Sequence, residues 1–120
     1  MNKTSGVITH LEDKGCDVCL IQETYLKHSD TAKLQEIRDY GWNIFSSPRA
    51  ERSGGGIGIL YRDGVKLKYT PVKMKFKSFQ VQEALIGGGQ DLTRLCNIYR
   101  PPYTGKARFT EAQFLEEFVD

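Results

Sequence analysis

A short apolar run that ends abruptly in polar residues constrains the fold of this chain more than any other feature. Residues 17–21 read DVCLI, and residues 22–24 read QET. A continuous apolar run of this length is typical of a strand that is covered on both faces. We therefore expect a fully buried strand at 17–21, which would hold Glu23 on a rigid element at the edge of a sheet.

Two helices are predicted around this strand. The first runs to about Asp13 and stops near Gly15, and the second lies between a capping cluster at 29–31 and Gly41. Each has apolar residues at helical spacing, namely Val7, Ile8 and Leu11 in the first and Leu34, Ile37 and Tyr40 in the second.

The chain from residue 42 to Tyr99 has the pattern of short strands separated by turns. Strands are predicted at 42–45, 57–61, 72–76, 79–86 and 92–99. In the third of these, apolar residues alternate with lysines, as in a strand with one apolar and one cationic face. A last helix at 110–119 has the spacing of a capping box and an apolar face. This order of elements predicts an α/β fold, a sandwich in which helices cover a sheet.

The composition is that of one soluble globular domain, with 120 residues of which 39% are hydrophobic and 27% charged. No apolar run approaches the roughly 20 residues of a membrane span, and no signal-peptide pattern is present. Three cysteines, an odd number, fit a reducing compartment better than a disulfide-stapled secreted fold. We expect an intracellular protein with no membrane contact, and we infer no obligate protein partner. A net charge of +2 is too small to indicate a binding partner by itself.

Several patterns with a known chemistry are present but incomplete. The glycines at 54–56 lack the Lys-Ser/Thr of a phosphate-binding loop and precede a strand, which favours a turn. Cys16 and Cys19 form a single Cys-x-x-Cys pair, which does not favour zinc or redox chemistry, and His10 and His28 have no metal-ligand spacing. Five lysines could follow a DNA backbone, but a solvated strand face is favoured. They are Lys66, Lys68, Lys73, Lys75 and Lys77.

Four segments together resemble one protein family. They are DVCLIQET at 17–24, GGGIGILY at 54–61, NIYRPP at 97–102 and FLEEFVD at 114–120. In this order and spacing they are similar to the endonuclease/exonuclease/phosphatase superfamily, and within it to the endonuclease domain of LINE-type non-LTR retrotransposons. Each segment is weak alone, and together they are specific.

The resemblance implies a fold, a reaction and a site. The family fold is a four-layer α/β/β/α sandwich of the DNase I-like kind, and the reaction is Mg²⁺-dependent hydrolysis of DNA. By position, Glu23 matches the family's metal-binding glutamate, and Tyr99 matches its tyrosine near the scissile phosphate. Arg100 would add positive charge for the substrate. Without the resemblance, Glu23 reads as a solvated residue at a strand end, and Tyr99 as a packing aromatic before a proline turn.

The resemblance also implies that the chain holds only about the first half of the family domain. A strand that ends in a metal-site Asn is expected upstream of Met1, and Gly-Asp-Phe-Asn and Ser-Asp-His motifs are expected beyond Asp120. Two departures from the family pattern are present. YRPP at 99–102 replaces the Tyr-x-Pro-Asn of apurinic endonucleases and favours the retroelement branch. Gln80 stands where retroelement relatives have Glu, which indicates either decay or local variation.

Three hypotheses about function follow. In the first, the sequence is a fragment of a Mg²⁺-dependent endonuclease, a hydrolase that nicks target DNA in the nucleus for its retrotransposon. In the second, which we favour for this chain, it is a catalytically inactive retroelement remnant with at most weak attraction to nucleic acid. In the third, it is a folded interaction module. The nuclease ancestry requires that Glu23 and Tyr99 line one cleft.

Overall fold

The computed structural model describes residues 3–24, 26–27, 29–47, 56–72, 79–88 and 90–100. Within these residues the chain forms two helices and six strands. They are α1 (Lys3–Asp13), β1 (Val18–Gln22), α2 (Thr31–Asp39), β2 (Trp42–Ser47), β3 (Ile57–Arg62), β4 (Leu67–Thr70), β5 (Gln80–Gly88) and β6 (Asp91–Tyr99).

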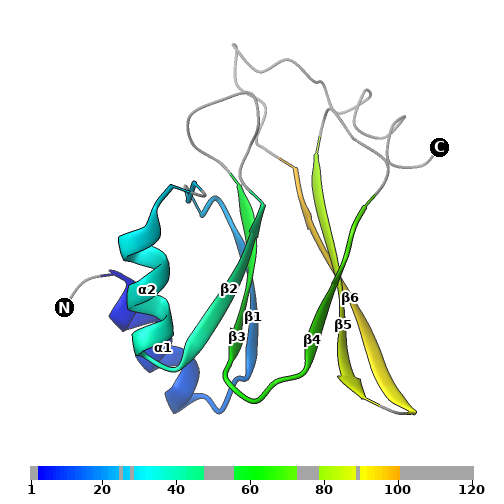
Figure 1. Ribbon diagram of the computed structural model, residues 1–120, viewed down its shortest axis with the longest axis horizontal. Helices are drawn as coiled ribbons and strands as arrows, with labels where there is room; N and C mark the ends of the chain where they lie inside the picture. The colour runs from blue at the N-terminus through cyan, green and yellow to red at the C-terminus, as the bar shows by residue number, and fades with distance from the viewer. Residues whose placement is uncertain are drawn as a thin grey trace.

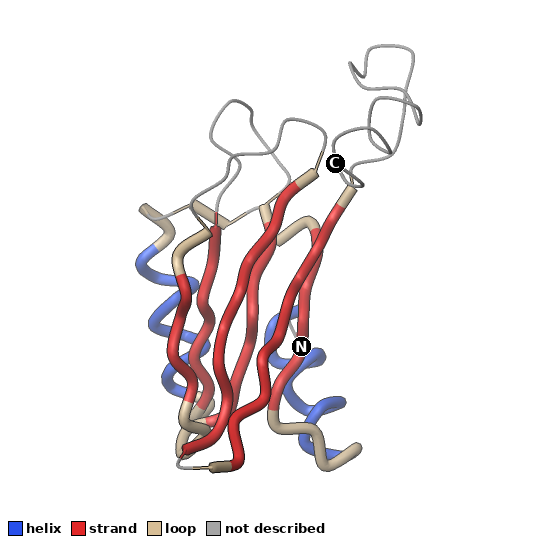
Figure 2. The backbone as a smooth tube through the Cα atoms, turned by 90° about the vertical axis from the view of Figure 1, so that its right-hand side faces the viewer, coloured by secondary structure: helices blue, strands red, loops and turns tan. Residues whose placement is uncertain are grey.

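The strands form two antiparallel sheets of three strands each. The order is β1-β3-β2 in the first sheet and β4-β5-β6 in the second. The helices lie on one side of the first sheet and the second sheet lies on its other side, which gives three layers (Figure 1). The strands of the two sheets run in similar directions, as in an aligned sandwich (Figure 2). The described part of the chain is therefore a mixed α/β domain, in agreement with the predicted class.

The helices and the first sheet share one apolar core. Ile8 and Leu11 of α1 and Ile37 of α2 pack against Trp42 and Leu60 of the sheet. Each such side chain contributes about 1.5–3 kcal/mol when it leaves water. This layer holds the helices on the face of the sheet that is turned away from the second sheet.

A glycine turn directs the chain from α1 into β1. Gly15 has φ +69°, and its N–H donates to the carbonyl of Glu12, while the N–H of Cys16 donates to the carbonyl of Leu11. This pair of bonds is a Schellman motif, which is built around a left-handed residue after the helix. The predicted stop at Gly15 is confirmed, and Cys16 packs against the core that contains Leu11.

The layer between the two sheets is partly apolar and partly polar. Ile57 and Ile59 of β3 and Ala84 of β5 are fully buried. The rings of Phe45 and Tyr69 contact each other across the layer, with their planes tilted by 49° and their centroids 3.7 Å apart. Two amide side chains, Gln82 and Asn97, are also fully buried in this layer.

Some expectations about individual elements are wrong. The strand at 17–21 was expected to be fully buried, but β1 lies at an edge of its sheet and Leu20 is 38% exposed, because β3 is the only described strand that pairs with it. Val7 and Tyr40, expected on apolar helix faces, are exposed. The sequence pattern also missed β4, since four residues give too short an alternation.

Other expected elements lie outside the described residues. They are the helix at 110–119, the proline turn at 101–102 and most of the lysine-rich strand at 72–76. No described helix covers the outer face of the second sheet (Figure 1). Neither described helix has the length and hydropathy needed to cross a membrane.

Candidate functional site

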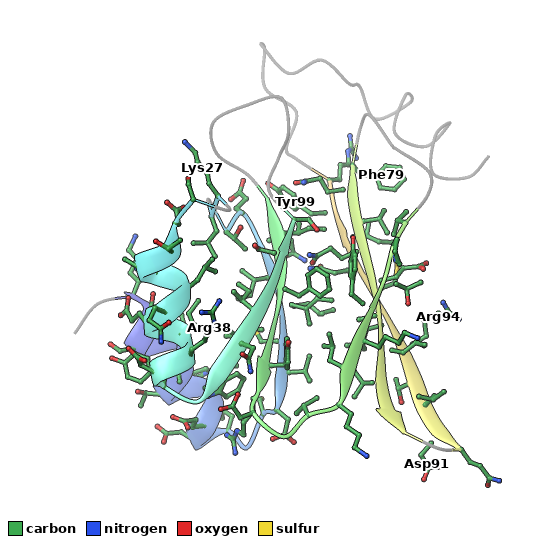
Figure 3. All side chains as sticks on the ribbon, in the orientation of Figure 1. Lys27, Arg38, Phe79, Asp91, Arg94 and Tyr99 are labelled. Atoms are coloured by element: carbon green, nitrogen blue, oxygen red, sulfur yellow. The ribbon has the colours of Figure 1, made fainter. Side chains whose placement is uncertain are left out.

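Glu23 and Tyr99 meet at one end of the sandwich, although they are 76 positions apart in the sequence. Glu23 directly follows β1, and Tyr99 is the last residue of β6. The Tyr99 hydroxyl donates a hydrogen bond to Oε1 of Glu23. Figure 3 shows Tyr99 at the end of β6 opposite to Asp91. The structure thus brings together the two residues that the sequence assigned to one site, one from each sheet.

The backbone of Glu23 explains how its side chain reaches Tyr99. The side chain of Ile21 packs in the helix-side core, so regular strand alternation would turn Glu23 toward the helices as well. Instead Glu23 has φ +56°, and it is the only residue other than glycine with positive φ in the described part of the chain. This left-handed conformation redirects the carboxylate to the other side of the sheet. It costs about 1–2 kcal/mol for a residue with a Cβ.

The chain is held on both sides of this turn. Thr24 donates its N–H to the carbonyl of Gly56 at 3.1 Å, which extends the contact between the β1 and β3 segments. The Thr24 hydroxyl accepts a bond from the N–H of Leu26 at 3.3 Å. Glu23 is therefore fixed between two anchored residues, while its side chain stays exposed to solvent.

A buried amide network lies directly behind the pair. The Nδ2 of Asn97 lies 3.1 Å from the carbonyl oxygen of Gly58, 3.4 Å from that of Ile21 and 3.3 Å from Oε1 of Gln82. The Oδ1 of Asn97 accepts a bond from Nε2 of Gln22 at 3.3 Å. Asn97 is thus the donor that joins β6 to two strands of the other sheet.

Gln82 extends the network to the third strand of the first sheet. Its Nε2 donates to the carbonyl of Phe45 and to Oγ of Ser47, both at 2.9 Å. Neither amide is among the site residues predicted from the sequence. The signal that could have found them is a Gln or Asn within an otherwise apolar strand pattern, because a buried amide needs partners from elsewhere in the fold.

The remaining charged candidates lie in different places. Arg100 directly follows Tyr99 and is half-buried. Lys68 pairs in register with Leu85, whereas Tyr99 pairs with Gln80 at the other end of β5. Lys66, just before β4, lies near Gly88 at that far end of the sheet. The structure therefore does not bring Lys66 or Lys68 to the Glu23–Tyr99 pair. Lys73, Lys75 and Lys77 lie outside the described residues.

The Cys-x-x-Cys pair of the sequence packs inside the fold. Cys16 and Cys19 pack against the helix-side core. Burial, and then the neighbouring Cys16, raise the pKa of the Cys19 thiol, which favours its neutral form over a metal-binding thiolate. His10 lies exposed in the last turn of α1, and His28 lies outside the described residues.

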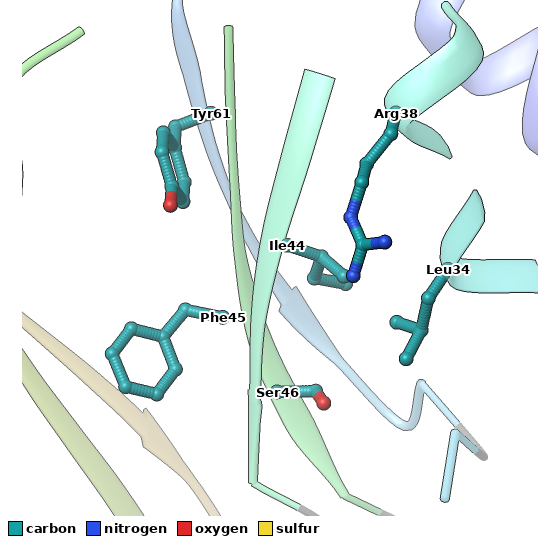
Figure 4. Close-up of a pocket in the computed structure, with 6 residues that line it drawn as sticks. All are labelled: Leu34, Arg38, Ile44, Phe45, Ser46 and Tyr61. Carbon is teal, nitrogen blue, oxygen red and sulfur yellow. The ribbon is translucent and has the colours of Figure 1, made fainter. Parts of the chain in front are cut away.

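One open depression surrounds the edge strand β2, and it has a volume of about 340 Å³. Phe45 and Tyr61 lie on one side of this strand, and Leu34, Arg38 and Ile44 lie on the other (Figure 4). The depression follows the edge of the first sheet and is open to solvent, so it is not an enclosed cavity. Neither Glu23 nor Tyr99 lines it, so it has no part in the candidate site.

The chemistry of the pair fits part of a magnesium site. Mg²⁺ prefers oxygen ligands and commonly binds through one or two carboxylates, with water and substrate phosphate in the other positions. Glu23 supplies such a carboxylate, and Tyr99 supplies a second oxygen beside it. The described residues contain no group of three or more His, Cys, Asp or Glu side chains placed to hold a metal.

Comparison with known proteins gave no match among protein-family models, curated proteins or solved structures.

Proposed function

We propose that this chain is part of a Mg²⁺-dependent DNA endonuclease domain, a phosphodiester hydrolase of the endonuclease/exonuclease/phosphatase kind derived from a LINE-type retrotransposon. The contact between Glu23 and Tyr99 carries the proposal. The resemblance places these two residues in one active site, and they meet from different sheets. The α/β/β layers of the described residues are compatible with three layers of a DNase I-like sandwich.

Each residue would have a distinct role in hydrolysis. The reaction requires neutralisation of the phosphate charge, a positioned water and a proton acceptor. Glu23 would hold Mg²⁺ through its carboxylate, and the ion would supply charge neutralisation. Tyr99 would use its hydroxyl as a donor to a phosphate oxygen, and Arg100 would attract the DNA backbone.

Manganese binding tests the metal role on this chain. Mn²⁺ broadens the NMR signals of nearby nuclei, and it accepts the same oxygen ligands as Mg²⁺. We expect the amide signals next to Glu23 and Tyr99 to broaden first and to recover on addition of excess Mg²⁺. Glu23→Gln should abolish this selective broadening. Glu12→Gln, an exposed carboxylate on α1, is the matched control and should leave it unchanged. Broadening that survives Glu23→Gln would contradict the proposed role.

A second candidate function, a catalytically inactive remnant, is favoured by one observation. Glu23 stands in no larger group of metal-capable side chains within the described residues. We propose that this chain alone leaves supercoiled plasmid uncut in Mg²⁺ or Mn²⁺, since the proton acceptor and the other ligands that hydrolysis needs are not assembled there. Nicking that disappears in Glu23→Ala would overturn this second candidate.

A further inference from the structure

The buried amide of Asn97 connects β6 with β1 one step before the Glu23–Tyr99 contact. Asn97 precedes Tyr99 by two residues in β6, and Ile21 precedes Glu23 by two residues in the β1 segment. Asn97 bonds to the carbonyl of Ile21, and Tyr99 bonds to Glu23. We infer that Asn97 is a positioning residue, which sets the alignment of the two sheets so that Tyr99 reaches Glu23.

The spacing of the two links supports this role. Residues two apart in a strand point to the same face and lie about 6.6 Å apart along it. Asn97 and Tyr99 are such a pair in β6, whereas in the β1 segment the left-handed backbone of Glu23 turns its side chain toward the second sheet, so the first link lies next to the second. β1 and β6 belong to different sheets and share no ladder of backbone bonds. The alignment of β1 with β6 along the strand direction is then set by contacts that side chains make, such as those of Asn97.

The chemistry of the position supports it as well. Asn97 is 1% exposed, and each of its polar atoms has a partner. Apolar contacts between sheets are non-directional and tolerate sliding, whereas hydrogen bonds require one arrangement. An apolar side chain at this position could pack the sheets together, but it would not select the alignment that joins Tyr99 to Glu23.

The positioning of Tyr99 by Asn97 can be tested without assuming a function. A catalytic role of the aligned Glu23–Tyr99 pair rests on the proposed function. The test uses the chain labelled with ¹³C at the ring carbon that bears the tyrosine hydroxyl, whose NMR shift responds to hydrogen bonding. The chain has six tyrosines, and Tyr99→Phe assigns the relevant signal. Glu23→Ala gives the position of that signal when the hydrogen-bond acceptor is removed.

Asn97→Ala should move the Tyr99 signal toward the position that it has in Glu23→Ala. Gln82→Ala is the comparison variant, because Gln82 is 0% exposed and accepts a bond from Asn97 but itself bonds to β2, so Asn97 keeps its links to Ile21 and Gln22 when Gln82 is removed. We expect Gln82→Ala to lower stability and to leave the Tyr99 signal at its wild-type position. An unmoved signal in Asn97→Ala, or an equal shift in Gln82→Ala, would overturn the inference.

A milder variant keeps the inference testable if Asn97→Ala does not fold. Gln22 is exposed and donates to Oδ1 of Asn97. Gln22→Ala therefore removes one hydrogen bond that holds the Asn97 side chain and leaves no cavity in the core. It should shift the Tyr99 signal in the same direction by a smaller amount, and no shift would count against Asn97 as a positioning residue.

Adding Mn²⁺ to the same samples tests the metal role of Glu23 separately from the positioning role of Asn97. In the wild-type chain Mn²⁺ should broaden signals at both Glu23 and Tyr99; in Asn97→Ala the broadening should persist at Glu23 and weaken at Tyr99. A wild-type chain without selective broadening rejects the metal role, while the shift of the Tyr99 signal still decides the positioning role.

Discussion

At the scale of single residues, Glu23 combines an unfavourable backbone with a specific contact. Its left-handed conformation favours glycine, yet a glutamate occupies the position and bonds to Tyr99. Positions of this kind concentrate at functional sites, where the surrounding structure holds the conformation in place. The backbone of Glu23 turns its carboxylate toward Tyr99, so both features belong to the same candidate site.

The conformation of Glu23 predicts an unusual order of stability between two variants. Both Glu23→Gly and Glu23→Ala lose the bond to Tyr99, but only glycine removes the backbone cost. We expect Glu23→Gly to be more stable than Glu23→Ala by about 1 kcal/mol, the reverse of the usual order at a strand or helix position. Urea unfolding followed by fluorescence of the single, buried Trp42 measures the difference. Equal stability, or a more stable alanine variant, would contradict the left-handed conformation.

A second residue-scale prediction concerns Cys96. Partial burial, and then the carboxylate of Glu83 opposite it in β5, raise the pKa of the Cys96 thiol. Glu83→Gln removes the second cause, so the pKa falls and the thiolate fraction at pH 8 rises. Because the thiolate is the reactive form, iodoacetamide should modify Cys96 faster in Glu83→Gln than in the wild-type chain. Peptide mass mapping measures the rate, with Glu12→Gln as a distant control that should not change it.

Sequence reasoning found some of the site residues and missed others for a physical reason. Glu23 and Tyr99 lie in recognisable motifs at the ends of strands, so their positions could be predicted. Asn97 and Gln82 lie within apolar patterns, and nothing local says which carbonyl groups they meet. Their partners come from strands up to 76 positions away, and only the packing of the two sheets brings them together.

At the scale of elements, Gly58 allows β3 to lie close to the segment that carries Glu23. A Cβ at Gly58 would lie 3.0 Å from Cδ1 of Ile44 and 3.2 Å from Cγ2 of Thr24. Both neighbours are side-chain ends, so they can shift, but Thr24 directly follows Glu23. Gly58 therefore connects the packing of the first sheet with the geometry of the site.

Crowding at Gly58 predicts a coupled pair of substitutions. We expect Gly58→Ala to lower the free energy of unfolding by about 1–3 kcal/mol through overpacking. Ile44→Val removes the crowded Cδ1 and should itself cost about 0.5–1.5 kcal/mol. In the double variant the loss should be smaller than the sum of the two single losses, as measured by urea unfolding. Strictly additive losses would show that Ile44 does not limit the space at Gly58.

Element boundaries were predicted better than element environments. Gly15 and Gly41 have local signals, and each lies at the helix end that was expected. Whether a strand is central or at an edge depends on its neighbours. The prediction of a fully buried strand was therefore wrong for β1, which lies at the edge of its sheet.

At the scale of the whole molecule, the second sheet presents an apolar outer face that no described element covers. Its outward residues are Val81, Leu85, Leu92 and Ile98, beside the ion pair of Glu83 and Arg94. Leu92 is 54% exposed and Ile98 is 38% exposed. The ion pair lies between Leu92 at one end of β6 and the Val81–Ile98 pair at the other. Exposed apolar side chains on an uncovered sheet face favour association.

The outer face predicts concentration-dependent self-association of this chain. Leu92→Lys together with Ile98→Lys should lower the weight-average mass in sedimentation experiments, because charges on the face oppose its burial. Val7→Lys is a matched control, since Val7 is 45% exposed but lies on α1. It should leave association unchanged. A monodisperse wild-type chain would instead favour the hypothesis of a folded interaction module.

The α/β class could be predicted from the sequence, whereas the division into two sheets could not. Alternation and turn signals identify strands one at a time. The assignment of β1, β2 and β3 to one sheet and β4, β5 and β6 to the other depends on tertiary pairing, as in the return of β3 between β1 and β2. The expected four-layer arrangement stays a prediction.

The left-handed backbone at position 23 also bears on how copies of this sequence change over generations. Where the proposed endonuclease function is under selection, glutamate should persist there despite its energetic disadvantage. Where selection acts on the fold alone, glycine should replace glutamate more often at that codon than at neighbouring strand positions, because the left-handed backbone accepts it more readily. Under the proposed function, the codon thus records whether selection acts on the activity or on the fold alone.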